Sequence, residues 1–177
     1  METFLLRKSV PLVYEKSEII PAVPRAYGLV LFTNVCVSSV LMLTLGFKVA
    51  AARKLYTDKA LKDGDKDAEA RYAYPKLYAE GFSDPAKAFN CVQRAHQQAL
   101  ETYPQFLALS LVGGVQYPLT CAVGGALWVW ARWVWAEGYA TGDPSKRYGH
   151  VVSRGIWTGL LVQIIAAGAT SLSTAIN

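Results

Sequence analysis

The sequence predicts an all-α membrane protein built as a bundle of four transmembrane helices. Two uncharged runs support this fold class, 21 residues from Tyr27 to Phe47 and 23 residues from Gly155 to Asn177. Roughly 20 apolar residues are enough to cross the hydrocarbon core of a bilayer. The chain is also 53% hydrophobic and only 18% charged, whereas soluble domains carry roughly 25% charged residues. The alternative interpretation of both runs is buried helices of a soluble bundle.

The two middle helices are predicted from a central uncharged run of 30 residues, from Thr102 to Ala131. This run is too long for one ordinary span and too short for two, and the segment Gly113-Gly-Val-Gln-Tyr-Pro118 interrupts it with a strong turn signal. Two crossings become possible if each helix also takes in polar residues at its far end. We therefore expect an N-terminal arm, residues 1–26, and a membrane domain, residues 27–177, with spans at about 27–50, 90–112, 119–139 and 153–175.

The Lys and Arg residues predict the orientation, because cytoplasmic loops of membrane proteins are enriched in them. The two loops that follow the first and third spans carry ten such residues, against four on the opposite side. We expect both loops in the cytosol.

The net charge of +5 does not predict nucleic-acid binding, since acidic residues between positions 58 and 69 are interleaved with the basic ones. The three cysteines follow no ligand spacing, so no metal site is expected.

A polar face on the second predicted helix is the first functional signal. Arg94, Gln97, Gln98 and Glu101 occupy positions i, i+3, i+4 and i+7, which share one face of an α-helix. Ionisable residues inside a membrane span predict a functional site. His96 is offset from this face, and we expect it to pack against a neighbouring helix.

A second stripe lies on the third predicted helix, where Trp128, Arg132, Trp135 and Tyr139 share one face. The two tryptophans belong either to an aromatic belt at the membrane interface or to the wall of a site. Arg132 either pairs with Glu101 or Glu137 or meets a ligand. These polar groups converge near the cytosolic ends of the spans. Such a site suits a small hydrophilic anion that reacts with a lipophilic partner dissolved in the membrane.

Three segments in matching order carry a family resemblance: Tyr74-Pro-Lys-Leu-Tyr78, Phe89-Asn-Cys-Val-Gln-Arg-Ala-His-Gln-Gln-Ala-Leu-Glu-Thr-Tyr-Pro104 and Gly138-Tyr-Ala-Thr-Gly-Asp-Pro-Ser-Lys-Arg147. They resemble the third type of microsomal glutathione S-transferase, a branch of the family of membrane-associated proteins in eicosanoid and glutathione metabolism. The resemblance covers about Tyr27 to Ala169. It implies a homotrimer that binds glutathione between neighbouring subunits near the cytosolic side, in the endoplasmic reticulum or the mitochondrial outer membrane.

The resemblance also implies roles for individual residues. Arg94 and Glu101 would hold the charged ends of glutathione, and Arg147 or Lys146 would stabilise its thiolate. Lys54 would assist the leaving or accepting group. The other residues expected at the glutathione site are Arg53, Asn90, Gln98, Trp135 and Tyr139.

The implied activity is a glutathione transferase and peroxidase that acts on lipophilic electrophiles or lipid hydroperoxides, with glutathione as co-substrate and no metal. Two residues depart from the family pattern. Gln98 stands where Asn is usual, and Trp135 stands where several members have Tyr. The alternative function is therefore a non-catalytic family member that binds lipid or serves as an accessory subunit of a larger membrane complex.

Overall fold

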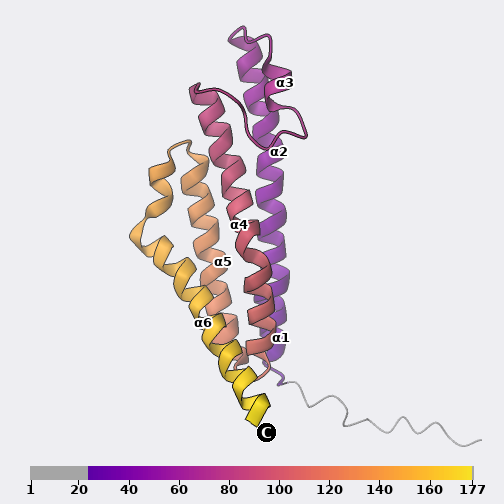
Figure 1. Cartoon of the computed structure of the whole chain (residues 1–177), viewed down its shortest axis with the longest axis vertical. Helices are drawn as coiled ribbons and strands as arrows, with labels where there is room; N and C mark the ends of the chain where they lie inside the picture. Colours follow the sequence, from indigo (N-terminus) through magenta and orange to yellow (C-terminus); the bar gives the residue numbers. More distant parts are fainter. Residues whose placement is uncertain (1–23, 177) are drawn as a thin grey trace, which may run out of the picture.

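Residues 24–176 of the chain are described by a computed structural model and fold mostly into helices (Figure 1). The first long helix runs without a break from Tyr27 to Lys62, because three helical stretches follow one another directly. No strand occurs among residues 24–176, so the all-α prediction is confirmed for this part of the chain. The elements are α1 (Tyr27–Val30), the π-helical η1 (Leu31–Val37), α2 (Ser38–Lys62), α3 (Ala68–Tyr72), α4 (Asp84–Gly114), α5 (Pro118–Ala140), the 3₁₀-helical η2 (Pro144–Tyr148) and α6 (His150–Ile176).

The long helices lie side by side, with α4, α5 and α6 in mutual contact and α2 packed chiefly against α4. In Figure 1 the connection from α2 to α4 and the connection from α5 to α6 lie at the upper end of the bundle. We call this the loop end. The start of α1, the turn between α4 and α5 and the end of α6 lie at the lower end, which we call the turn end. The two basic loops thus share one end of the molecule.

Two helical stretches, Tyr27–Lys62 and Arg154–Ile176, are long and apolar enough to cross a membrane. The first predicted span lies within Tyr27–Lys62, and α4, α5 and α6 contain the second, third and fourth. Several helices extend beyond these spans, since α2 continues to Lys62 and α4 begins at Asp84. The membrane boundaries stay predictions. The predicted arm, residues 1–26, lies outside the described residues except for 24–26.

The start of α4 and the turn after it follow local sequence signals. The Ser83 hydroxyl accepts a hydrogen bond from the Ala86 amide (3.4 Å), and a proline occupies the first turn, as is typical of a helix N-terminus. At the other end we expected Gly113 to begin a turn, but α4 continues through Gly114. A Cβ added at Gly113 would lie 2.8 Å from the Cβ of Ala166. The glycine therefore allows α6 to pass close to α4.

Buried amides tie the turn end together. The side chains of Asn34 and Gln163 are completely buried, and both donate to the carbonyl oxygen of Cys121, at 3.0 and 2.9 Å. One carbonyl of α5 therefore joins η1 and α6. Polar side chains between helices act in this way where the surroundings supply no water.

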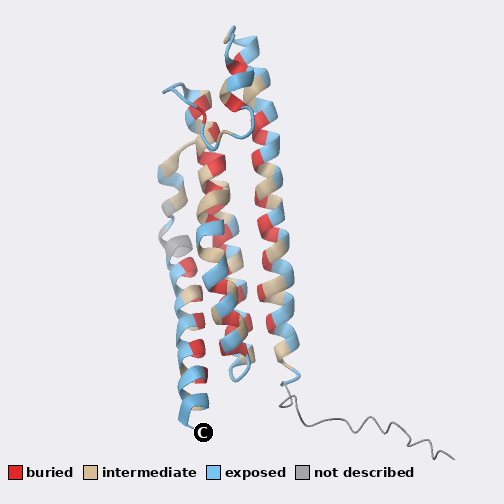
Figure 2. Ribbon diagram, turned by 45° about the vertical axis from the view of Figure 1, so that its right-hand side comes forward, coloured by how far each residue is buried: buried red, intermediate tan, exposed pale blue. Residues whose placement is uncertain are grey.

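The outer surfaces of the long helices are apolar. Figure 2 shows buried positions along the inward faces and exposed positions along the outward faces. Large apolar side chains such as Phe47, Trp157 and Ile165 are more than half exposed. An apolar exterior of this extent suits contact with lipid or with further protein.

Candidate functional site

The polar face of α4 divides into two parts. Arg94 and Glu101 form an ion pair through two contacts, Nη1 to Oε1 at 2.6 Å and Nη2 to Oε2 at 3.3 Å. Their side chains remain 37% and 47% exposed. The two amides are engaged with other elements, since Gln97 accepts from the Tyr78 hydroxyl (2.6 Å) and Gln98 accepts from α5. The charged pair is thus the open part of this face.

A second guanidinium, that of Arg132 on α5, lies inside the bundle with only 2% of the residue exposed. It donates to Gln98 Oε1 and, at 2.8 Å, to Thr102 Oγ1. Of the two possibilities for Arg132, an ion pair with Glu101 or Glu137 is wrong for this chain, and contact with a ligand stays a prediction. Five residues place Glu137 about 140° around the helix from Arg132. Arg132 therefore faces α4, and its acceptors are an amide and a hydroxyl.

Glu137 belongs to a different contact, between α5 and α2. It accepts a hydrogen bond from Lys48, and the Lys48 ammonium also lies 4.7 Å from the centre of the Trp133 ring. This ion pair links the two helices at a point where they otherwise make few contacts.

The tryptophans of the predicted stripe enclose Arg132. Trp128 is completely buried and stacks on Phe106 with ring centres 4.1 Å apart, and Trp135 is 7% exposed. The guanidinium carbon of Arg132 lies 5.3 and 5.8 Å from the centres of these two rings. An aromatic belt at the membrane surface does not fit these positions. We call Gln98, Thr102, Trp128, Arg132 and Trp135 the Arg132 cluster.

The segment after α5 brings Arg147 back against that helix. Asp143 caps η2 by accepting from the Ser145 amide (2.9 Å) and hydroxyl (2.7 Å), and these bonds lower the pKa of its carboxyl. A Cβ at Gly138 would lie 2.6 Å from the Lys146 carbonyl oxygen, so the glycine permits this close approach. The guanidinium carbon of Arg147 lies 4.9 Å from the centre of the Tyr139 ring. Of the two candidate basic residues, Arg147 is therefore the one whose side chain stacks against Tyr139.

Two predicted site residues hold the connection from α3 to α4. Arg53 is 7% exposed and donates to the carbonyl oxygens of Tyr72 (2.8 Å) and Lys76 (2.6 Å). The amide of Asn90 makes two bonds with Ala79, accepting from its N–H (2.8 Å) and donating to its C=O (2.9 Å). These contacts fix the chain path over the loop end of α4.

A cleft of about 390 Å³ lies between this connection, α4, α5 and η2. Three of the predicted site residues line it: Asn90, Arg94 and Tyr139. The structure adds residues that the sequence did not single out as site residues. They are Tyr78, Gly81, Phe82, Lys87, Cys91 and Pro144. Tyr78, Cys91 and Pro144 belong to the segments noted for their resemblance, whereas Gly81, Phe82 and Lys87 lie outside those segments.

The other predicted residues lie outside the cleft wall. Gln98 and Trp135 lie deeper, in the Arg132 cluster, and Glu101 is connected to the cleft through its ion pair with Arg94. Arg53 is bound to the loop carbonyls. Lys54 is exposed on α2 and does not line the cleft.

The cleft has the chemical character of an anion site with apolar walls. Arg94 and Lys87 supply positive charge, and Tyr78, Phe82 and Tyr139 supply aromatic surface. Guanidinium groups bind carboxylates through charge-assisted hydrogen bonds. Among residues 24–176 no three His, Cys, Asp or Glu side chains gather as a metal site would require.

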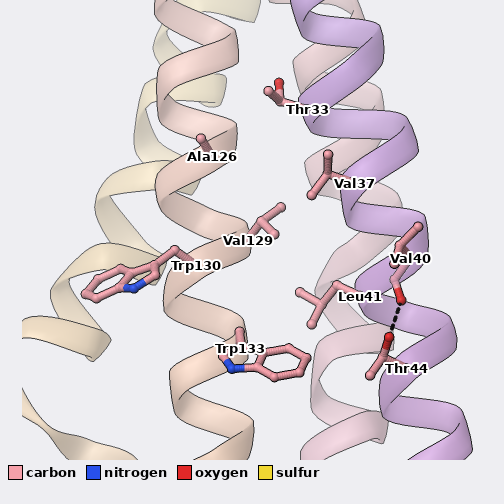
Figure 3. A pocket seen from close by; sticks show the side chains of 9 residues that line it. All are labelled: Thr33, Val37, Val40, Leu41, Thr44, Ala126, Val129, Trp130 and Trp133. Carbon is pink, nitrogen blue, oxygen red and sulfur yellow. Dashed lines mark hydrogen bonds between the residues drawn. The ribbon is translucent and has the colours of Figure 1, made fainter.

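A separate apolar groove of about 360 Å³ runs between the first helix and α5 (Figure 3). Its two hydroxyls are satisfied within their own helix, since Thr33 donates to Leu29 O (2.8 Å) and Thr44 donates to Val40 O (2.7 Å). The walls are otherwise aliphatic and aromatic, with Trp130 and Trp133 along α5. A groove of this kind within the predicted spans suits hydrocarbon chains or another apolar protein surface.

A comparison with protein families identifies the family of this chain. The family model described as the MAPEG family matches residues 30–166, which is more than half of the chain. The match includes the Arg132 cluster, the cleft and both connections at the loop end.

Proposed function

Because this chain belongs to the MAPEG family, which includes glutathione transferases and proteins of eicosanoid metabolism, we propose that it is a membrane-bound glutathione S-transferase of the third microsomal type. Its substrates would be lipophilic electrophiles and, as a peroxidase, lipid hydroperoxides. The observation that carries this proposal is the exposed Arg94–Glu101 pair beside a cleft that Tyr139 lines, with Arg147 stacked on Tyr139.

The ion pair supports the binding of a zwitterion. Glutathione carries an ammonium group and carboxylates, so its ammonium would meet Glu101 and a carboxylate would meet Arg94. In each new contact, Arg94 or Glu101 would exchange its present partner for a charged group of glutathione and form a charge-assisted hydrogen bond with it. The exchange is inexpensive, because an exposed ion pair contributes only about 0–1 kcal/mol.

Arg147 would act on the thiol. A thiol with a pKa of about 8.5 is only slightly ionised at neutral pH, and a nearby guanidinium favours the thiolate. In conjugation, the sulfur forms a bond to the electrophilic carbon, and the leaving group departs with the bonding electrons. In hydroperoxide reduction, the sulfur takes the terminal oxygen, the O–O bond breaks, and the lipid alkoxide gains a proton. A second glutathione then converts the sulfenic acid to the disulfide and water.

The proposal includes a homotrimer with its site facing the cytosol, in the endoplasmic reticulum or the mitochondrial outer membrane. The side chains of Arg94 and Glu101 are 37% and 47% exposed although they lie in a predicted span. Charged side chains in a membrane are expected to face the interior of an assembly or a water-filled cavity. A neighbouring subunit would supply that cover.

The test is glutathione-dependent turnover by the purified protein in detergent, with a small nitroaryl chloride and a fatty-acid hydroperoxide as substrates. Arg147→Ala should lower kcat by about tenfold or more, which corresponds to at least about 1.4 kcal/mol, and should change the KM for glutathione less. Lys146→Ala is the matched control and should retain kcat. Activity no higher than that of heat-treated protein would contradict the proposal.

A non-catalytic, lipid-binding or accessory role is the second candidate. The observation that favours it is that the amides of Gln98 and Asn90 are engaged by Arg132 and Ala79. Glutathione at 100 times its Kd should stabilise a protein that binds it by about 2.7 kcal/mol. A melting temperature that millimolar glutathione leaves unchanged would favour this second candidate, as would co-purification with a larger complex at fixed stoichiometry.

A further inference from the structure

Residues 73–83, which join α3 to α4, carry large apolar side chains that pack into no core. Tyr74 is 71% exposed, Leu77 is 54% exposed, Tyr78 is 45% exposed and Phe82 is fully exposed. We call residues 73–83 the connecting segment. Clustered exposed apolar groups commonly mark a contact surface.

The position of the connecting segment is nevertheless fixed by buried and half-buried donors. Arg53 holds the carbonyl of Lys76, and Asn90 binds both backbone groups of Ala79. A third contact joins the Tyr78 hydroxyl to Gln97 on α4. A segment that is anchored at three points while its apolar side chains stay exposed is arranged for contact with another molecule.

Only part of this apolar surface faces the cleft. Tyr78 and Phe82 line it together with Tyr139 and Pro144. The Tyr74 ring instead covers the Arg53 guanidinium at 4.3 Å. Leu77 is exposed and does not line the cleft. The segment therefore divides into a cleft-facing pair and side chains that point elsewhere.

We propose that Tyr78 and Phe82 bind the apolar body of the molecule that reacts with glutathione and favour partners with long apolar chains. This inference rests on the proposed function. Arg147, which would hold the thiolate, stacks on Tyr139, and Tyr139 forms one wall of the cleft. A molecule that reaches the sulfur beside Tyr139 through this cleft would contact Tyr78 and Phe82, which line the same cleft.

The expected loss of ligand affinity comes from the apolar contact that the Phe82 ring would make with the ligand. Removal of the Phe82 ring should weaken the binding of a ligand's alkyl chain about tenfold, which corresponds to about 1.4 kcal/mol. Tyr78→Phe retains the ring and removes the bond to Gln97, so its effect should be smaller.

The experiment compares glutathione with S-hexylglutathione, which adds an apolar chain at sulfur. Kd values are measured by calorimetry on the full-length protein in detergent. The unmodified protein should bind S-hexylglutathione more tightly than glutathione, and Phe82→Ala should reduce this preference about tenfold, again about 1.4 kcal/mol. Leu77→Ala is the matched control from the same segment and should keep the preference. In turnover, Phe82→Ala should raise the KM of a long-chain hydroperoxide more than that of a short-chain one.

The outcomes distinguish this inference from the function on which it rests. If Phe82→Ala binds both ligands as the unmodified protein does, the inference is overturned while the proposed function stands. If the unmodified protein binds neither ligand, both are overturned. If Phe82→Ala instead changes the oligomeric mass in detergent, the segment is a contact between copies of the chain, and the assignment to substrate is wrong.

Discussion

The Arg132 cluster and the cleft beside α4 are built from the same kinds of side chain, yet they differ in burial. Each contains an arginine, an amide and aromatic rings. Arg132 is 2% exposed and bound to Gln98 and Thr102, whereas Arg94 is 37% exposed by side chain and paired with Glu101. We expect a buried arginine held between two helices, as Arg132 is, to act as scaffold. An arginine that shares one exposed carboxylate can exchange it for a ligand.

The aromatic rings show the same difference. In the cluster, Trp128 is stacked on Phe106 and has no exposed surface. In the cleft, Tyr78 and Phe82 are exposed, and both line the cavity. Burial therefore separates side chains that stabilise the bundle from side chains that remain available for binding.

Arg132→Ala should have the largest effect on stability. It leaves Gln98 and Thr102 without their donor and opens a cavity between two tryptophans, so we expect a loss of about 3 kcal/mol. Thermal unfolding in detergent measures it. Arg154→Ala is the control, because Arg154 is exposed at the start of α6. Equal stability of the two variants would contradict a scaffold role for Arg132.

Asn90→Ala should release the connecting segment without unfolding the bundle. It removes two hydrogen bonds, each with a net contribution of about 1 kcal/mol, so local opening should become easier by about 2 kcal/mol. Amide exchange at Ala79 and proteolysis after Lys76 report this opening. The control is Gln116→Ala, which removes an exposed amide bond to Ser173 at the turn end. An unchanged exchange rate at Ala79 would contradict this prediction and show that the other anchors hold the connecting segment without Asn90.

Glu101→Gln should affect ligand binding more than stability. The KM for glutathione should rise about fivefold, which is roughly 1 kcal/mol, because the ligand's ammonium loses its carboxylate. The exposed pair itself contributes about 0–1 kcal/mol to stability. Glu137→Gln is the control, since Glu137 pairs with Lys48 outside the cleft. An assembly that dissociates without ligand, with unchanged glutathione affinity, would instead place Glu101 in the scaffold.

The smallest predicted effect concerns pH and the cap of η2. Hydrogen bonds from Ser145 hold the pKa of Asp143 below its ordinary value of 3.8. The carboxylate therefore stabilises η2 above that value, and the contribution is lost as pH falls through the lower folded-state pKa. Protection of the Ser145 amide should decrease below pH 3.8. Asp143→Asn has no such titration and should show no comparable decrease.

Helical periodicity allowed part of the candidate site to be predicted. Arg94 and Glu101 are seven residues apart, and this spacing placed them on one face of α4 before their contact was known. The same argument aligned Trp128, Arg132 and Trp135. It did not identify the partner of Arg132, because Gln98 and Thr102 lie on another helix and are reached only through the packing of α4 against α5.

The part of the cleft wall that the connecting segment forms could not be predicted from any local pattern. The position of Phe82 depends on Arg53 and Asn90, which hold the connecting segment from two different helices. Such anchors join residues that are distant in sequence, and helical periodicity does not relate residues on different helices. The exposure of Phe82 could therefore not be anticipated from its sequence neighbours.

The sequence by itself determined the helical class, the apolar stretches and the spacing of polar residues along each helix. These depend on the 3.6-residue period and on local composition, which every segment carries with it. Only the tertiary structure decided which arginine is buried, which carboxylate each cation meets and which loop residues border the cleft. Those outcomes depend on how the helices pack and where a long connection is anchored, and both involve contacts between residues far apart in the chain.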